Sequence, residues 1–90
     1  MSNRVKVKND GNQAEVIDAL LAAGHAVQVL NQGMGCPDLL VCRKGDCVLF
    51  LIEVKEPGKK LTEWQEKFAK RWPGRIIVAH TGAEALEGMR

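Results

Sequence analysis

The chain has 90 residues, 46% of them hydrophobic, which is enough for one domain with its own core and too little for two. Thirteen lysine and arginine residues against eleven acidic ones give a net charge of +2, which does not by itself indicate a nucleic-acid-binding protein. The three cysteines include no Cys-x-x-Cys pair, so neither a disulfide framework nor a zinc module is expected.

Turn signals divide the chain into seven short elements. Ile17, Leu20 and Leu21 recur at helical spacing before Gly24, and the alternation around Val27 is typical of a strand. The expected elements are a helix over residues 12–23, strands over 26–30, 38–43 and 47–55, a helix over 62–72, a strand over 75–80 and a short helix after Thr81. This order, α-β-β-β-α-β-α, predicts a single α/β domain over residues 1–90 in which helices flank a mixed sheet.

The sequence between the two central strands favours a β-hairpin. If the Gly-Asp dipeptide at residues 45–46 forms a two-residue turn, counting back along both strands places Asp38 directly opposite Glu53, with their Cβ atoms about 5 Å apart. Lys55 lies two residues after Glu53 and therefore points to the same face. A four-residue turn would instead pair Asp38 with Leu51 and keep the three side chains on one face, whereas a three-residue loop would break this geometry.

Two carboxylates this close repel each other by about 3 kcal/mol at an effective dielectric constant of about 20. A bound divalent cation would remove the repulsion, and the oxygen ligands of Asp38 and Glu53, with the main-chain carbonyl of Val54, suit Mg²⁺ or Mn²⁺. The ammonium of Lys55 could orient or help to deprotonate a water, or neutralise charge on a phosphate that the metal polarises. The alternative is an ion pair between Glu53 and Lys55 at a strand end, with Pro37 and Asp38 in a simple turn.

Three segments stand out by their order and spacing: GCPDLLV at residues 35–41, IEVK at residues 52–55 and LTEWQ at residues 61–65. Together they resemble the virus-type replication-repair nuclease domain, VRR-NUC, of the PD-(D/E)xK nuclease superfamily, in its stand-alone phage or bacterial form. The resemblance extends over residues 12–86. It implies a restriction-endonuclease-like core and hydrolysis of DNA phosphodiesters with Mg²⁺ or Mn²⁺ as cofactor.

The resemblance also implies roles for five residues. Asp38 and Glu53 correspond to the metal ligands and Lys55 to the catalytic lysine. Glu15 corresponds to the family's N-terminal acidic residue, which faces the metal, and Gln65 to its helix glutamine beside the site.

Glu15 and Gln65 also have a structural interpretation. Asn12 with Glu15, and Thr62 with Gln65, have the spacing of capping boxes, in which the third residue bonds back to the start of the helix. Thr81 begins a third such pair, where no chemistry is expected. With the family resemblance, we favour a functional role for both residues.

Stand-alone members of this family resemble Holliday-junction resolvases, which implies an endonuclease of DNA repair and recombination that acts on branched DNA such as a four-way junction. Resolving a four-way junction takes two nicks on opposing strands, and each chain has one site, so we expect a homodimer. The alternatives are a flap, nicking or restriction-like endonuclease with the same site, or a non-catalytic DNA-binding module. Lys59 and Lys60, with Arg4 and Lys6 in a basic arm or edge strand over residues 1–10, are the candidate DNA contacts.

Further features bear on location, cofactors and the helix aromatics. No segment approaches the roughly 20 apolar residues of a membrane span, and the N-terminus lacks the apolar core of a secretory signal, so we expect a cytoplasmic protein without membrane contact. The resemblance to the stand-alone form of the family implies that it is bacterial or phage-encoded. Gly33 and Gly35 are followed by no lysine-bearing phosphate-loop motif, so no small-molecule cofactor is expected. Trp64, Phe68 and Trp72 share one helix face, which favours a core or subunit contact over base stacking.

Overall fold

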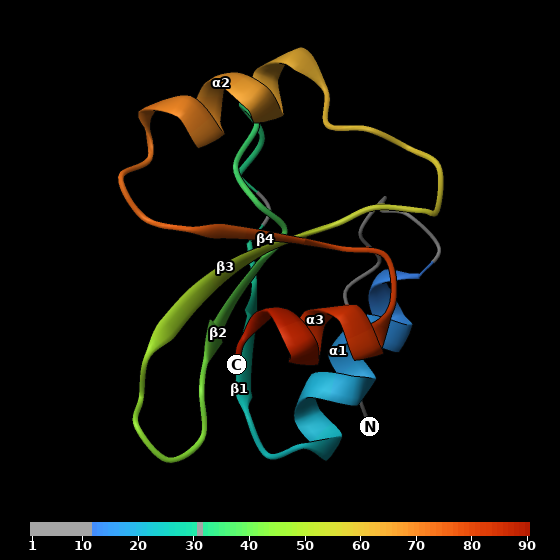
Figure 1. Ribbon diagram of the computed structural model, residues 1–90, viewed down its shortest axis with the longest axis vertical. Coiled ribbons are helices and arrows are strands. Elements are labelled where there is room, and N and C mark those ends of the chain that lie inside the picture. Colours follow the sequence, from blue (N-terminus) through green and yellow to red (C-terminus); the bar gives the residue numbers. More distant parts are fainter. Residues whose placement is uncertain (1–11, 31) are drawn as a thin grey trace.

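The computed structural model describes residues 12–30 and 32–90, which form helices and strands in the predicted order α-β-β-β-α-β-α (Figure 1). The elements are α1 (Gln13–Ala22), β1 (Ala26–Val29), β2 (Leu39–Cys42), β3 (Leu49–Val54), α2 (Glu63–Arg71), β4 (Ile76–Ala79) and α3 (Gly82–Gly88). The strands form one mixed sheet in the order β1-β2-β3-β4, in which β4 runs parallel to β3 and the other neighbours are antiparallel. The basic arm expected over residues 1–10 lies outside the described residues.

The register between β2 and β3 decides which side chains meet across the hairpin. The N–H of Arg43 donates to the carbonyl of Val48 at 2.8 Å and closes a four-residue loop over residues 44–47. The expected two-residue turn over residues 45–46 is therefore wrong: Cys47 takes a positive φ of 61° and its N–H donates to the carbonyl of Arg43 at 3.0 Å, so Cys47 belongs to the loop together with Gly45, whose φ is 103°. The loop has the same centre as the expected turn, so the predicted register is retained, with Leu39 paired to Ile52.

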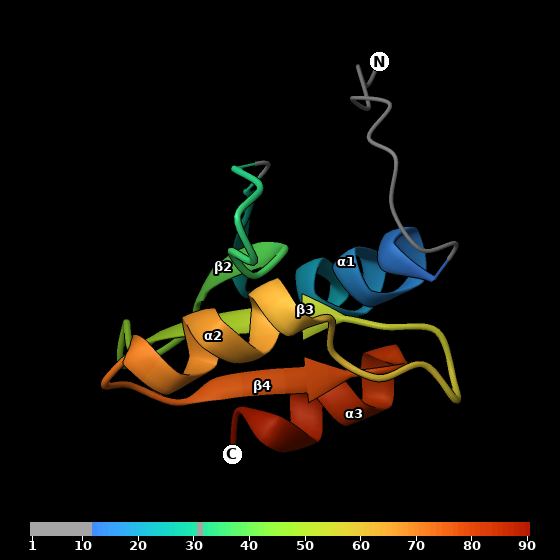
Figure 2. The same cartoon turned by 90° about the horizontal axis from the view of Figure 1, so that it is seen from above.

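One side of the sheet carries the hydrophobic core. Alternate residues of each strand face opposite sides, and on this side Leu39, Val41 and Ile52 are fully buried. Val16 and Leu20 of α1 pack against them, and α3 lies beside α1 on the same side. Figure 2 shows α2 apart from this pair of helices.

The second side of the sheet carries Glu53 and is covered only in part. Phe68 of α2 is buried, whereas Leu49 at the start of β3 has 61% of its surface exposed, and Val78 of β4 is also exposed. Apolar residues therefore line both sides, as predicted, but only the first side is closed by helices. None of the helices in residues 12–30 and 32–90 is long and apolar enough to cross a membrane.

Two adjacent leucines of α1 test which side of that helix stabilises the fold. Leu20 is fully buried, whereas Leu21 has 53% of its surface exposed. We expect Leu20→Ala to lower the free energy of unfolding by about 2–5 kcal/mol, because it leaves a cavity among the core side chains. Leu21→Ala is the matched control and should change it by less than about 0.5 kcal/mol. Denaturant unfolding followed by circular dichroism measures both, and similar losses would contradict the described core.

Candidate active site

Asp38 and Glu53 lie on the second side of the sheet, where the hairpin ends. Asp38 directly precedes β2, one residue beyond the last pair, Leu39 with Ile52. Continuing this register places Asp38 opposite Glu53, on the side opposite to the core. The hydrogen bond that closes the hairpin loop shows that Arg43 and Val48 form a hydrogen-bonded pair. Hydrogen-bonded and non-hydrogen-bonded pairs alternate along an antiparallel ladder, so Asp38 and Glu53 form a non-hydrogen-bonded pair. In such pairs the Cα atoms are only about 4.5 Å apart and the side chains are closest.

The backbone around Asp38 is fixed by both neighbouring strands. Its carbonyl accepts a hydrogen bond from the N–H of Leu30 at 2.7 Å, and its carboxylate oxygen Oδ2 accepts one from the N–H of Val54 at 2.8 Å. The ladder position opposite Val54 belongs to Pro37, which has no N–H and cannot donate to the Val54 carbonyl. The hydrogen-bond ladder between β2 and β3 thus ends at Pro37. The Asp38 carboxylate, in place of a backbone carbonyl, accepts the hydrogen bond from the Val54 N–H, at the edge where the Val54 carbonyl also lies.

Glu53 is buried, with only 3% of its surface exposed, and Gln65 of α2 binds its carboxylate. Gln65 Nε2 donates to Glu53 Oε2 at 2.9 Å. The other end of the same amide closes a capping box, because Gln65 Oε1 accepts from the N–H of Thr62 at 2.8 Å while Thr62 Oγ1 accepts from the N–H of Gln65. The structural and functional interpretations of Gln65 therefore hold together: the cap occupies the amide oxygen and turns the NH₂ group toward Glu53.

Lys55 follows β3 on the same side of the sheet as Glu53. Its backbone N–H donates to the carbonyl of Ala79 at 2.9 Å, which extends the pairing with β4. The ion pairs described for residues 12–30 and 32–90 join Arg43 with Asp46, Lys67 with Glu63, His80 with Glu84 and Arg90 with Glu87. The Lys55 side chain is half-buried.

The structure does not gather Glu15 with the other acidic residues. Glu15 is exposed on α1, and its Oε2 accepts a long hydrogen bond of 3.4 Å from the N–H of Gly82 at the start of α3. The capping box that was its structural alternative does not form either: Asn12 makes no side-chain cap hydrogen bond, and its Nδ2 donates to the carbonyls of Lys55 and His80, at 2.9 and 2.6 Å. Among the described residues, no three acidic, histidine or cysteine side chains form a group that could hold a metal.

Cys36 is a neighbour of the acidic pair that the sequence analysis did not include among the site residues. Burial raises the pKa of its thiol, and the negative charges of Glu53 and Asp38 raise it further, against a smaller opposing effect of Arg71. The half-buried thiol thus lies in the negative potential of both carboxylates. The sequence signal that could have placed Cys36 near the site is its position two residues before Asp38. Arg71 on α2 is a nearby cation that the sequence analysis did not select.

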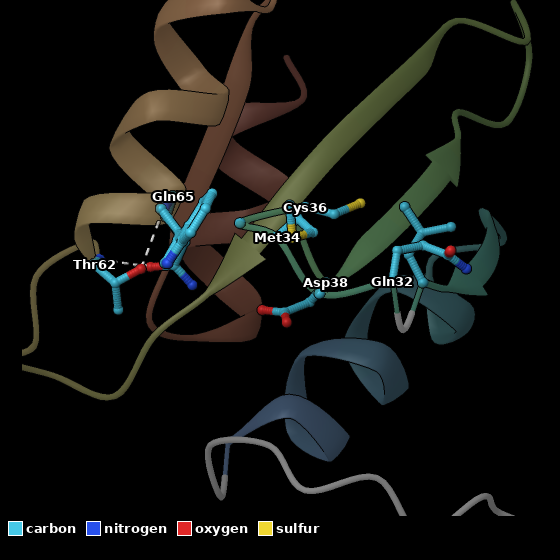
Figure 3. A pocket seen from close by; sticks show the side chains of 10 residues that line it. Gln32, Met34, Cys36, Asp38, Thr62 and Gln65 are labelled. Carbon is cyan, nitrogen blue, oxygen red and sulfur yellow. Dashed lines mark hydrogen bonds between the residues drawn. The ribbon is translucent and has the colours of Figure 1, made fainter.

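A pocket of about 480 Å³ opens beside Asp38, between the loop that precedes β2 and the start of α2 (Figure 3). Its lining consists of Leu30, Gln32, Gly33, Met34, Gly35, Cys36, Asp38, Thr62, Trp64 and Gln65. The pocket therefore joins one acidic residue of the candidate site to the helix that positions the other.

Gly35 brings this loop into contact with α2. It has a φ of 79°, and a Cβ atom there would lie 2.2 Å from the carbonyl oxygen of Trp64 and 2.9 Å from the backbone nitrogen of Gln65. Only glycine allows so close an approach to a helix backbone. The absence of a side chain at this position thus sets the distance between the Asp38 loop and the Gln65 cap.

The donor set fits a hard divalent cation. Asp38 and Glu53 supply carboxylate oxygens on one side of the sheet, and the Val54 carbonyl lies at the same edge. Oxygen donors of this kind suit Mg²⁺ and Mn²⁺, and a cation would offset the repulsion between two carboxylates of which one is buried.

Replacement of Gly35 tests the contact between the loop and α2. We expect Gly35→Ala to lower the free energy of unfolding by about 2–5 kcal/mol, because the new Cβ combines an unfavourable φ with a backbone collision. Gly33→Ala is the matched control, since Gly33 has a similar φ of 68° but a methyl group there would meet no atom within 4 Å. It should cost only about 1–2 kcal/mol. Equal losses in denaturant unfolding would show that the close approach of Gly35 is not what holds the loop.

Comparisons with known proteins address the fold. No family model matches the sequence, and no curated protein matches it. A solved structure described as "VRR_NUC domain" is similar, with a TM-score of 0.71 and 21% sequence identity over 93% of this chain and 96% of that chain. The chain therefore has the fold of a VRR_NUC domain, as the motif resemblance predicted.

Proposed function

We propose that the protein is a metal-dependent DNA endonuclease of the PD-(D/E)xK type. The observation that carries the proposal is the meeting of Asp38 and Glu53 across the β2–β3 hairpin, with Lys55 next along the same side. The likeness in fold to a VRR_NUC domain supports it, since the motif resemblance assigns the metal ligands and the lysine of that domain to these three residues. A purely structural hairpin gains nothing from two facing acids at this point.

Each residue of the proposed site has a chemical task. Asp38 and Glu53, with the Val54 carbonyl, would hold Mg²⁺ or Mn²⁺, which when bound supplies Lewis acidity toward a phosphate oxygen. Lys55 places an ammonium where it can orient the attacking water or neutralise charge that develops on the phosphate. Gln65 holds the Glu53 carboxylate in one orientation through the 2.9 Å hydrogen bond from Nε2.

Glu15 is a proposed additional ligand only if its carboxylate leaves the Gly82 N–H. The present hydrogen bond is long, 3.4 Å, and Glu15 is exposed, so this rearrangement would be inexpensive. Proposed DNA contacts are the exposed Lys59 and Lys60, in the segment that joins β3 to α2. Their charges would neutralise phosphates without reading sequence. Arg4 and Lys6, proposed for the same task, lie outside the described residues.

Cleavage assays with point variants test the enzymatic proposal. Wild-type protein should cut DNA with Mg²⁺ or Mn²⁺ and lose activity with a chelator, and Lys55→Ala should cut at least about 100-fold more slowly, because transition-state charge is then less stabilised. Asp38→Asn should behave similarly. Lys44→Ala is the matched control, since Lys44 is exposed in the loop at the far end of the same hairpin and should cut normally.

The outcome also separates the enzyme from a non-catalytic DNA-binding module. Binding without cleavage in any metal, unchanged in Lys55→Ala, would establish the binding module and end the enzymatic proposal. Thermal unfolding of each variant shows whether a loss of activity reflects loss of fold.

For the substrate, we propose branched DNA cut by a homodimer, most simply a four-way junction. One candidate site is present per chain, and a junction with two-fold symmetry is resolved by two nicks on opposing strands. The exposed Leu49 and Val78 on the second side of the sheet, with Trp72 of α2, offer apolar surface that a second copy could cover. Flap, nicking or restriction-like cleavage by the same site is the remaining alternative.

Light scattering and substrate comparison test this part. We expect a dimer at micromolar concentration and paired nicks in a four-way junction, with slower cleavage of flaps and linear duplex. Leu49→Asp should shift the protein to monomers and abolish paired nicking, whereas Leu21→Asp, at a leucine of α1 that is also more than half exposed, should not. A monomeric wild type that still resolves junctions would refute the dimer, and preference for flaps or linear duplex would refute the junction substrate.

A further inference from the structure

Trp64 differs from the other two aromatic residues of α2. Phe68 is buried and stacks on Trp72, with ring centroids 5.4 Å apart and an interplanar angle of 20°. Trp64 is not part of that stack and leaves 56% of its surface exposed. The aromatic face that the sequence predicted as one contact is therefore divided, and Trp64 does not contribute to the core.

The position of Trp64 connects it to the candidate active site. Trp64 lines the pocket that also contains Asp38, and the next residue, Gln65, donates to the carboxylate of Glu53. Gly35 lies against the Trp64 carbonyl, so the ring is carried on backbone that is packed against the loop leading to Asp38. A group held on this ring would lie next to the phosphate that the acidic pair is proposed to receive.

The loop that forms the other wall of the pocket carries an exposed apolar side chain in an unusual backbone conformation. Met34 has a φ of 57°, in the left-handed region that non-glycine residues seldom adopt, and it is exposed. It lies between Gly33 and Gly35, which also have positive φ. Met34 and Trp64 thus line the same pocket with a flexible thioether and a flat aromatic ring. These are surfaces suited to a flat, uncharged group.

A cation accompanies the aromatic ring. The Lys67 ammonium lies 5.5 Å from the centroid of the Trp64 ring, and its ion pair with Glu63 is long, 3.8 Å, and largely exposed. Such exposed pairs contribute little, so Lys67 can exchange Glu63 for a phosphate. Lys67 thus lies over one face of the ring, and a base would stack on the other face; proteins bind single-stranded nucleic acids with such a combination of aromatic rings and cations. The pocket volume of 480 Å³ also falls within the range of small-ligand pockets, about 300–1,000 Å³.

We propose that this pocket is a subsite for one unpaired DNA base beside the cleaved phosphate, stacked on Trp64, with Lys67 on its phosphate; the proposal rests on the proposed nuclease function. A base must leave the duplex stack to lie on an aromatic ring, which costs least where pairing is already interrupted. The subsite therefore selects DNA with an unpaired nucleotide at or next to the cut, such as a branch point, over continuous duplex.

Fluorescence of single-tryptophan variants tests the stacking directly. The chain has two tryptophans, so Trp72→Phe leaves Trp64 as the sole indole and Trp64→Phe leaves Trp72. The probe is single-stranded oligothymidylate of about ten nucleotides, with chelator present to prevent cleavage. We expect the probe to quench the fluorescence of Trp72→Phe and to leave that of Trp64→Phe unchanged. Absence of quenching in Trp72→Phe, with or without binding by anisotropy, would overturn the proposal.

Removal of single bases identifies the nucleotide. In a four-way junction, an abasic nucleotide at the subsite position should weaken binding to the wild type by about 5- to 100-fold, and Trp64→Ala should weaken binding of the intact junction by a similar factor. In Trp64→Ala, the abasic nucleotide should not weaken binding any further, because both changes remove the same stacking interaction. Trp64→Phe should retain most of the affinity. Wild-type affinity in Trp64→Ala, or an abasic penalty that persists in it, would refute the subsite.

These binding measurements separate the subsite from the nuclease proposal. Quenching at Trp64 in a protein that cuts no DNA with Mg²⁺ or Mn²⁺ would refute the nuclease function and retain the base subsite. Metal-dependent cleavage with an unchanged KM in Trp64→Ala would refute the subsite and retain the nuclease.

Discussion

The pairing of β2 with β3 is the constraint on which the candidate site depends. Side chains alternate along a strand, so a slip of one residue would move Glu53 to the core side and Ile52 to the surface. Burial of Ile52 and Leu39 on the first side thus enforces the position of Glu53 on the second. Pro37 then ends the ladder, and Asp38 bonds the Val54 N–H in its place, which brings the facing acids to the end of the hairpin and not to its middle.

The acidic pair is completed by a helix that adds little to the core. α2 stands apart from the α1–α3 layer, and its buried residue is Phe68. Gln65 nevertheless links it to the sheet, since one amide serves the helix cap with its oxygen and Glu53 with its nitrogen. Gly35 provides the second link by allowing the loop to touch the α2 backbone. A site assembled at the boundary between a rigid hairpin and a weakly packed helix can accept a substrate without disturbing the core.

The same weak packing explains the surface of the second side. Because α2 covers only part of the sheet, Leu49 and Val78 remain exposed, and Trp64 extends beside the pocket and not into a core. Acidic ligands, an aromatic ring and exposed apolar strand residues consequently share one side of the molecule. The proposed nuclease site, base subsite and dimer surface would all use the side of the sheet that α1 and α3 leave free.

The sequence alone determined the elements, the hairpin register and the common side of Asp38, Glu53 and Lys55, because hydrophobic periodicity and the period of two in a strand are local properties. It did not determine the loop length, since the left-handed conformation of Cys47, a residue that seldom adopts it, leaves no signal in the sequence. Only the tertiary structure decided that Gln65 reaches Glu53, that Glu15 turns to Gly82 and that Trp64 stays exposed. Each of these depends on how closely one element packs on another, and periodicity shows which residues share a face without showing what covers that face.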